Sequence, residues 1–375
     1  MPELDNFAEI NLSAIKKNIK NLKKLAGEKT KLMAVIKADA YGHGAVHVGK
    51  TAIESGAYSL AVARSHEALE LRESGIKSQI LNLGYPLDEN LDYLTSENID
   101  ISVYDYESAL AISKKARDNG RTPNIHIKVD TGMGRLGITG TYDEIVREVK
   151  KIISLENLNP IGLFTHFSTA DEKSREYTDV QLAKFNQIIK GLNQNKIYFR
   201  QYHCANTAAL INYKHSRKDI VRTGIGIYGL YPSENIDRSK ICLHPAMTLK
   251  AKIIQIKTVK KDFNVSYGNT WKTQKDSRLA IIAIGYADGF PRRISSSSYF
   301  LINGQKAWIR GRICMDLCVV DITDIEGVKP GDYATIIGKS KDQYISADLH
   351  AENADTINYE IVSSLTSRVK RIYIN

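Results

Sequence analysis

Residues 124–130 read NIHIKVD, a segment in which aliphatic side chains alternate with side chains that carry charge or hydrogen-bonding groups, as in a β-strand inside a barrel. Successive side chains of a β-strand point to opposite faces, so His126, Lys128 and Asp130 share one face. We expect the aliphatic face to pack against helices, which turns the ionisable face toward the interior of a barrel. An unpaired lysine is costly to bury, so Lys128 requires a nearby anion or a change of its own charge.

Seven further apolar runs of similar length lie between residues 32 and 229, separated by amphipathic segments. They are LMAVIKA (32–38), YSLAVA (58–63), QILNLG (79–84), DISVYD (100–105), PIGLFTHF (160–167), YFRQYHCAN (198–206) and IVRTGIGIYG (220–229). Eight strands alternating with helices predict an α/β fold, an N-terminal (β/α)₈ barrel of the TIM type. An open doubly wound sheet is the alternative, but no G-x-G-x-x-G motif follows the first strand.

The character of the sequence changes after residues 231–233. Segments 246–259, 278–285, 299–320 and 333–338 are rich in strand-forming residues, and only 346–364 has a helical pattern. We therefore predict two domains, a barrel over residues 1–235 and a mostly antiparallel β domain over residues 236–375. The first ten or so residues are candidates for pairing with the second domain.

Composition narrows the class of protein. A net charge of +10 raises the question of nucleic acid, but the lysines are scattered over predicted helix surfaces and are not interleaved with aromatic residues. No apolar run approaches the ~20 residues that span a bilayer, and the acidic N-terminus lacks the features of a secretory signal. The four cysteines form no C-x-x-C pair, so we predict no metal site. A cytoplasmic enzyme that binds neither nucleic acid nor membrane is expected.

Polar groups at the C-terminal ends of the predicted strands are candidates for the active site, since barrel enzymes build their sites there. Lys37 closes the first apolar run, and it is either a lysine whose charge reaches solvent or a desolvated amine suited to forming a Schiff base. A glycine-rich loop after residue 130 delivers Arg135, which suits a carboxylate. Taken alone, His166 is more typical of a satisfied core histidine than of a site residue.

Two more strand ends carry groups suited to an anionic ligand. Residues 203–207 read His-Cys-Ala-Asn-Thr and run into a helix, which places Thr207 at a helix N-terminus where phosphate can bind. The last predicted strand places Arg222 in the barrel and is followed by Gly224, whose amide a ligand can approach. The coincidence of such groups at five strand ends points to one catalytic centre.

The chain resembles the bacterial alanine racemases over essentially its whole length. The motifs that carry the resemblance are AVIKADAYGHG, KVDTGMGRLG, THFSTADE, HCANTAA, VRTGIGIYGL, VSYGNT, IGYADGFPRR, GRICMD and TINYE. Members of that family are homodimers that depend on pyridoxal phosphate (PLP), with a (β/α)₈ barrel and a C-terminal β domain. The resemblance implies an isomerase that interconverts L-alanine and D-alanine, supplies D-alanine for peptidoglycan and shares its active sites across the dimer interface.

The resemblance also implies roles for individual residues. Lys37 would bind PLP covalently, and Lys37 and Tyr267 would be the two catalytic bases, with Tyr267 contributed by the neighbouring subunit. Arg135 and Met315 would bind the substrate carboxylate, and Lys128 would be carbamylated, which resolves the problem of its charge. The remaining expected cofactor contacts are Tyr41, His166, His203, Asn206, Thr207, Arg222, Gly224, Ile225 and Tyr359.

Several other functions stay open on the sequence alone. A serine or broad-specificity racemase of the same fold differs only in pocket width, and a PLP-dependent barrel decarboxylase would use a cysteine near Met315. A PLP-binding protein without catalytic activity resembles the barrel alone, so the second domain and Tyr267 speak against it. A structural or nucleic-acid-binding barrel would bind no cofactor.

Overall fold

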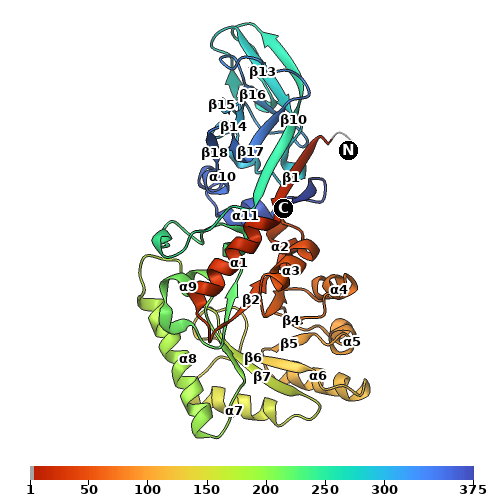
Figure 1. Ribbon diagram of the computed structural model, residues 1–375, viewed down its shortest axis with the longest axis vertical. Helices are drawn as coiled ribbons and strands as arrows, with labels where there is room; N and C mark the ends of the chain where they lie inside the picture. Colours follow the sequence, from red (N-terminus) through yellow and green to blue (C-terminus); the bar gives the residue numbers. More distant parts are fainter. Residues whose placement is uncertain (1–3) are drawn as a thin grey trace. The chain divides into compact units, whose positions relative to one another are not determined.

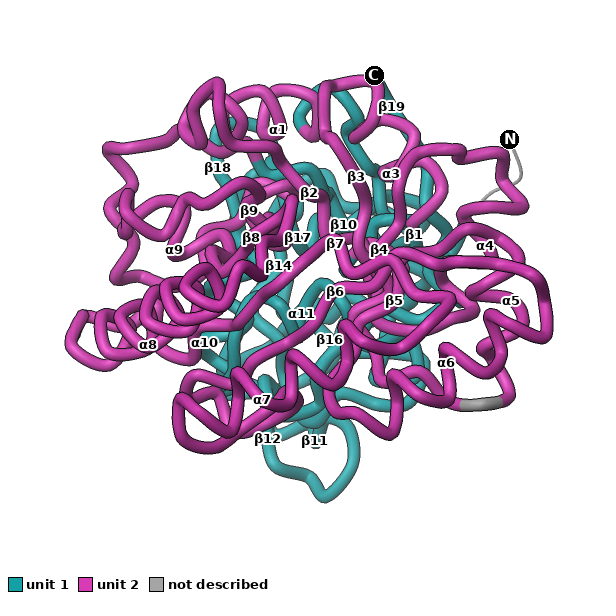
Figure 2. Tube along the Cα trace, turned by 90° about the horizontal axis from the view of Figure 1, so that it is seen from below, with its two compact units in different colours: residues 1–14, 41–44, 245–375 teal, residues 15–40, 45–244 magenta. Residues whose placement is uncertain are grey.

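The computed structural model describes residues 4–375, and within them the chain forms two compact units. Unit 2 holds residues 15–40 and 45–244, and unit 1 holds residues 41–44, 245–375 and the described part of residues 1–14. Figure 2 colours unit 1 teal and unit 2 magenta. Each unit buries aliphatic side chains of its own, such as Leu32 in unit 2 and Ile253 in unit 1.

Unit 2 is a closed barrel of eight parallel strands, which confirms the predicted fold. The strands are β2 (Lys31–Val35), β3 (Ser59–Val62), β4 (Gln79–Asn82), β5 (Asp100–Val103), β6 (Asn124–Lys128), β7 (Asn159–Phe164), β8 (Gln201–His203) and β9 (Ile220–Thr223). Each lies within a predicted apolar run or begins one residue before it. Pairing of β9 with β2 closes the ring.

Helices surround the barrel because each presents an apolar stripe to the strands. They are α1 (Leu12–Ala26), α3 (Ala45–Glu54), α4 (Ser65–Glu73), α5 (Leu91–Ser96), α6 (Tyr106–Asp118), α7 (Tyr142–Ile153), α8 (Glu176–Gln194) and α9 (Thr207–Asn212). In Figure 2, α3 to α8 lie outside the ring of strands. Asn11 caps α1, since the amide of Ala14 donates to its Oδ1 at 2.8 Å.

Unit 1 is built on a nine-stranded sheet whose pairs are antiparallel apart from β1 with β19, so the mostly antiparallel domain is confirmed. Its long central strand β10 is visible in Figure 1. The strands are β1 (Asn6–Asn11), β10 (Met247–Val259), β13 (Ser277–Ile282), β14 (Tyr299–Ile302), β15 (Gln305–Trp308), β16 (Cys318–Asp321), β17 (Tyr333–Ser340), β18 (Gln343–Ile345) and β19 (Lys370–Ile374). A separate hairpin pairs β11 (Asn264–Val265) with β12 (Trp271–Lys272).

The predicted helical segment of unit 1 is present as two short helices, α10 (Ala347–Ala354) and α11 (Asn358–Ser363). None of the helices formed by residues 4–375 combines the length and the apolar character needed to cross a bilayer.

The turn α2 (Lys37–Gly42), which follows β2, has an unusual backbone. Ala38, Asp39, Ala40 and Tyr41 all have φ between 50° and 53°, so four consecutive residues with side chains adopt the left-handed region. That conformation costs about 1–2 kcal/mol per residue for L-amino acids. Strained backbone of this kind is concentrated at functional sites, and this turn begins at Lys37.

Candidate active site

Lys37 lies at the C-terminal end of β2 and begins the left-handed turn. Glu67 supports the turn, because its Oε1 accepts a hydrogen bond from the amide of Ala38 at 2.5 Å. Burial lowers the pKa of Lys37, the positive charge of Arg135 lowers it further, and Glu67 opposes both. An amine with a lowered pKa is a better nucleophile and base near neutral pH.

Lys128 ends β6 and is buried, as the alternation of residues 124–130 predicts. Its Nζ donates to the carbonyl oxygen of Leu136 at 2.5 Å. Burial and then the charge of Arg135 lower the pKa of Lys128 to about 8, against the opposing charge of Asp130. Within residues 4–375 no carboxylate forms an ion pair with it, so the need for an anion inferred from the sequence persists.

The loop after β6 is organised by the carboxylate of Asp130. Its Oδ1 accepts from the amides of Gly132 (2.8 Å) and Met133 (2.6 Å), and its Oδ2 accepts from those of Gly134 (2.8 Å) and Arg135 (3.1 Å). Burial alone would raise the pKa of Asp130, but these four N–H donors hold it below its ordinary value. The loop thereby holds Arg135, whose side chain is exposed, next to the end of β6.

Arg222 is 3% exposed, and its guanidinium donates to a ring of acceptors. Nη1 lies 2.8 Å from Nδ1 of His203, and Nη2 lies 3.1 Å from Nδ1 of His166 and 2.8 Å from the carbonyl oxygen of Thr165. Burial lowers the pKa of Arg222 to about 10, so it keeps its charge at neutral pH. Within the described chain its Nε–H has no acceptor, which leaves one directed donor for a ligand.

His166 follows β7, and the charges of four basic side chains affect its pKa. Burial and then the charges of Arg222, Arg135, Lys128 and Lys37 lower the pKa of His166 well below its ordinary value, so the imidazole is neutral. Four basic side chains, from the turn after β2, the end of β6, its loop and β9, therefore act on the C-terminal end of the barrel strands. Such a concentration of charge favours an anionic ligand.

The segment after β8 and the turn after β9 meet at Thr207. Its Oγ1 accepts from the amide of Gly224 at 3.1 Å, and Ile225 follows at the start of a 3₁₀ turn. A Cβ atom on Gly226 would lie 2.7 Å from Cγ2 of Thr207, so the close approach of the two segments requires glycine there. Asn206 caps α9, since its Oδ1 accepts from the amide of Ala209 at 2.9 Å. We therefore see a structural role for Asn206.

Tyr41 and Tyr359 lie together in unit 1. Their ring centroids are 6.0 Å apart, with Tyr41 at the end of the left-handed turn and Tyr359 in α11. Both rings are half-buried. The two cofactor contacts predicted from this unit are therefore neighbours in the structure.

Tyr267 stands at the tip of the hairpin formed by β11 and β12, and 67% of it is exposed. The preceding Ser266 has φ 64° and ψ −173°, a region that residues with side chains rarely adopt. Oγ of Ser266 donates to the carbonyl oxygen of Arg312 at 2.5 Å and lies 3.4 Å from Sγ of Cys314. Met315, which is 52% exposed, comes next in the chain, so two predicted site residues share an exposed region of unit 1.

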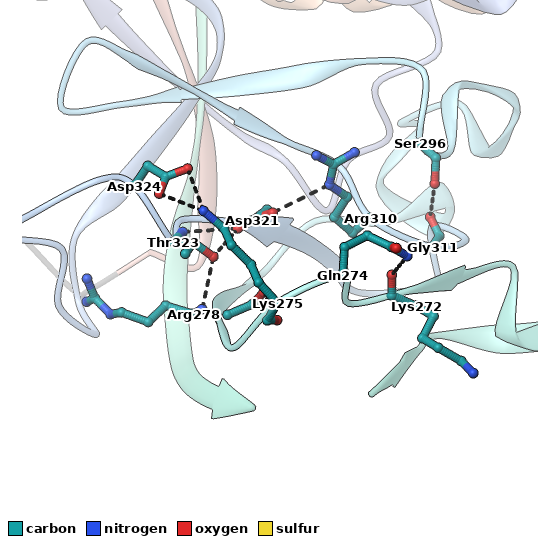
Figure 3. Close-up of polar contacts among 11 residues, drawn as sticks. Lys272, Gln274, Lys275, Arg278, Ser296, Arg310, Gly311, Asp321, Thr323 and Asp324 are labelled. Carbon is teal, nitrogen blue, oxygen red and sulfur yellow. Dashed lines mark hydrogen bonds and ion pairs between the residues drawn. The ribbon is translucent and has the colours of Figure 1, made fainter. Parts of the chain in front are cut away.

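A cation contacts the hairpin strand β12 close to the turn that carries Tyr267. The guanidinium of Arg310 lies over the ring of Trp271 in β12 at 5.0 Å. Its Nε lies 3.7 Å from Oδ2 of Asp321 in β16, a contact drawn in Figure 3. Figure 3 also shows Lys275 paired with Asp324 at 3.1 Å, on the segment that follows the hairpin. Arg310 therefore links the hairpin that carries Tyr267 to the main sheet.

Three residues of the barrel contact the site or its supporting groups but are not among the predicted site residues. Glu67 supports the left-handed turn, and Asp100 and His126 extend the contacts of His203 across the barrel. Period-2 alternation places His126 on the inward face, and this was the only signal for it in the sequence. Nothing in the sequence marked Asp100 or Glu67, because their roles depend on contacts between strands and helices.

The sequence matches two family models, described as the N-terminal domain of alanine racemase over residues 10–232 and its C-terminal domain over residues 246–373. The chain is 44% identical to an alanine racemase of Methanococcus maripaludis over 98% of both chains. Among solved structures, the alanine racemase of Clostridium difficile 630 is similar with a TM-score of 0.95 and 38% identity, covering 100% of this chain and 97% of that one. A histidine racemase of Leuconostoc mesenteroides is also similar, with a TM-score of 0.90 and 29% identity, covering 100% and 99%.

Proposed function

The chain belongs to the alanine racemase family and is a racemase, and from that premise we propose that it interconverts L-alanine and D-alanine with PLP as cofactor, supplying D-alanine for the cell wall. The observation that carries the proposal is the buried guanidinium of Arg222, bound to His166 and His203, in a site where the charges of Lys37, Lys128 and Arg135 also lower the pKa of His166. PLP carries a phosphate and the substrate carries a carboxylate, so an electropositive site suits both.

The residues of the barrel fit PLP in three ways. Lys37 has a lowered pKa, which favours the neutral amine that attacks an aldehyde. Arg222 keeps its Nε–H free of protein acceptors, and a pyridine nitrogen is a matching acceptor. The hydroxyl of Thr207 and the backbone of Gly224 and Ile225 offer the polar cradle that a phosphate requires.

The remaining cofactor contacts are proposals from family resemblance, supported by placement. Tyr41 and Tyr359 pair within unit 1 and would direct their hydroxyls to the phosphate. His203 would act on the cofactor through Arg222, to whose Nη1 it is hydrogen bonded. PLP, when bound, would withdraw electrons from the α-carbon of the substrate so that its proton can leave.

Racemisation removes the α-proton on one face and returns a proton to the other, so it requires a base on each face. We assign Nζ of Lys37 to the proton of D-alanine and Oη of Tyr267 to the proton of L-alanine. The neutral imidazole of His166 accepts from Arg222, so its Nε2 carries a hydrogen that can be donated toward a tyrosinate. This would help Tyr267 act as a base near neutral pH.

Binding of the substrate carboxylate is assigned to Arg135 and to the amide of Met315. Arg135 suits a carboxylate because its planar guanidinium can donate two parallel hydrogen bonds. Carbamylation of Lys128, in which the neutral amine adds CO₂ and releases a proton, would replace its unpaired positive charge with an anion. It requires a neutral amine, and a pKa of about 8 makes a substantial neutral fraction available.

We propose a homodimer in which Tyr267 and Met315 of the partner subunit complete each site. Both side chains are more than half exposed in the single chain, and the Ser266 backbone strain marks their region as functional. Mixing Lys37→Ala and Tyr267→Phe chains tests this arrangement. One site in each mixed dimer would then combine an intact lysine with an intact tyrosine, so activity should return. If activity does not return in dimers shown to be mixed, both bases come from one chain.

A broader racemase is the second candidate, because the histidine racemase shows that the same fold accepts a larger side chain. The test is a chiral assay of the protein with PLP on L-alanine, L-serine and L-histidine. Alanine should give the highest kcat/KM, and Lys37→Ala should abolish the reaction. A clear preference for another amino acid would replace alanine as the substrate.

A further inference from the structure

A chain of buried polar groups runs across the barrel from Arg222. Nη1 of Arg222 lies 2.8 Å from Nδ1 of His203, and Nε2 of His203 lies 2.9 Å from Nδ1 of His126. Nε2 of His126 then lies 3.4 Å from Oδ2 of Asp100. These groups come from β9, β8, β6 and β5, and each residue is at most 3% exposed.

The available donors and acceptors fix the direction of each hydrogen bond in this series. Arginine has no acceptor, so Nδ1 of His203 must accept, and its proton sits on Nε2. Nε2–H of His203 therefore donates to Nδ1 of His126, which places the proton of His126 on Nε2 as well. Oδ2 of Asp100 lies 3.4 Å from that nitrogen, an ion-pair distance at which the two groups form no hydrogen bond in the structure, so Asp100 acts on the N–H through its charge. Both imidazoles are thus held as the Nε2–H tautomer.

The surroundings of His126 and His203 are fitted to these positions. The ring of His203 stacks on Phe164 with centroids 4.7 Å apart and planes 6° apart. A Cβ atom on Gly162 would lie 2.0 Å from Nδ1 of His126, so only glycine leaves room for that ring. The two rings therefore have little freedom to rotate out of the chain.

Asp100 lies at the end of this series of buried groups. Its other contacts are donors, the side-chain amide of Gln79 to Oδ2 and that of Asn124 to Oδ1, the latter at 3.0 Å. The carboxylate lines a cavity of about 360 Å³ at the N-terminal ends of the strands, which Arg72 and Lys77 also line.

Arg222 has no carboxylate of its own. Within residues 4–375 no aspartate or glutamate forms an ion pair with it, although it is buried and charged. A buried charge without a partner is costly. Through the two imidazoles, the negative charge of Asp100 is linked to the guanidinium.

We propose that Asp100 is a positioning residue, whose carboxylate at the end of this relay favours a hydrogen on Nε2 of His126, fixes the tautomers of His126 and His203 and so keeps Arg222 oriented toward the cofactor ring. The proposal rests on the proposed function, since it assigns Arg222 to the ring of PLP. Asp100 acts from the opposite end of the barrel and touches neither substrate nor cofactor. Replacing it with asparagine would remove this charge and offer an N–H beside Nε2 of His126, which favours the wrong tautomer, as in the serine protease triad.

The test begins with the tautomers, which can be read without any activity. The full chain is labelled with ¹⁵N at histidine, with and without PLP, and ¹H–¹⁵N correlation spectra are assigned with His126→Gln and His203→Gln variants. The relay requires the Nε2–H form at both histidines. An Nδ1–H form at either histidine of the wild-type protein overturns it, whether or not the protein racemises alanine.

Kinetics then test the consequence for Arg222. Asp100→Asn should shift the tautomer of His126 and lower kcat/KM for alanine about tenfold or more, the scale at which supporting hydrogen bonds affect sites. The loss should lie in kcat, with an altered cofactor spectrum, because the substrate carboxylate is bound elsewhere. Unchanged tautomers with unchanged kcat/KM overturn the proposal.

Two further variants separate positioning from a merely structural effect. Asp118→Asn removes an exposed carboxylate as the charge-matched control and should leave tautomers and rates unchanged. Asn124→Ser removes one donor to Asp100 but leaves the carboxylate, so it should lower stability and keep both tautomers. If Asp100→Asn fails to fold, Gly162→Ala displaces His126 directly and should produce the same loss in kcat.

Discussion

Nη2 of Arg222 lies 3.1 Å from Nδ1 of His166, while Nη1 of the same guanidinium lies 2.8 Å from Nδ1 of His203. One cation therefore holds two neutral imidazoles in fixed orientation, one at the predicted catalytic centre and one inside the barrel. The planar fork of arginine makes this possible, since a lysine ammonium cannot reach both acceptors in fixed directions.

Arg222→Lys should therefore destabilise the protein. Several buried acceptors would lose their donor, and each unsatisfied group costs about 1–3 kcal/mol, so we expect a loss of about 3 kcal/mol in the free energy of unfolding. Chemical denaturation of the protein without cofactor measures it, with the exposed Arg121→Lys as control. A loss no larger than that of the control would mean that the fork does not stabilise the fold.

Asp130→Asn should weaken substrate binding through the loop that carries Arg135. The amide can accept on one side only, so about half of the four backbone hydrogen bonds to the carboxylate would be lost. We expect KM for alanine to rise about tenfold, which corresponds to about 1.4 kcal/mol. The exposed Asp143→Asn is the matched control, and an unchanged KM in Asp130→Asn would show that the loop is held by other contacts.

The hairpin that carries Tyr267 should depend on Arg310. Arg310→Gln would remove both the contact with the Trp271 ring and the charge beside Asp321. We expect kcat for L-alanine to fall severalfold, because Tyr267 would be held less firmly, with a change in unfolding free energy of about 1 kcal/mol. Lys275→Gln, which removes the neighbouring exposed ion pair with Asp324, is the control. Equal effects of the two substitutions on kcat would contradict a specific role for Arg310.

His350 should make unit 1 sensitive to acid. Burial lowers the pKa of His350 to about 4, against the bond from its ring to the carbonyl oxygen of Ile336. Between pH 6.5 and 4 the unfolded chain therefore binds a proton that the folded state does not, so stability falls as pH falls through this window. The contribution at pH 5 relative to pH 7.5 is about 2 kcal/mol.

Urea unfolding of wild type and His350→Gln at these two pH values measures the effect. The variant should lose less stability on acidification than the wild type, and His215→Gln, which replaces an exposed histidine, should behave like the wild type. Parallel pH dependence of wild type and His350→Gln would mean that His350 is not the group that titrates.

The barrel could be predicted from the sequence because its strands are buried on both faces and read as short apolar runs. The inward position of Lys128 followed from period-2 alternation, and the positions of Lys37 and Arg222 followed from the rule that barrel sites lie at the C-terminal ends of strands. These signals lie within short segments, so they can be recognised in a single sequence.

Other features depend on contacts that a single sequence does not display. The left-handed turn after Lys37 needs Glu67 from another helix, and the strain at Ser266 is fixed by the segment that leads to Met315. The relay from Arg222 to Asp100 joins four strands through distances of a few ångströms. Asn206 was expected at the cofactor and caps a helix in the structure, since both roles use the same side chain in the same motif.

The central claim is that two bases act on opposite faces of the α-carbon of the substrate. It is tested most directly by proton exchange in D₂O with the Tyr267→Phe enzyme loaded with PLP. We expect D-alanine to exchange its α-proton through Lys37, with its configuration retained. Exchange of L-alanine should fall by about a hundredfold or more, the usual contribution of a positioned base. Equal exchange rates for the two enantiomers in Tyr267→Phe would contradict the assignment of Tyr267 as the second base.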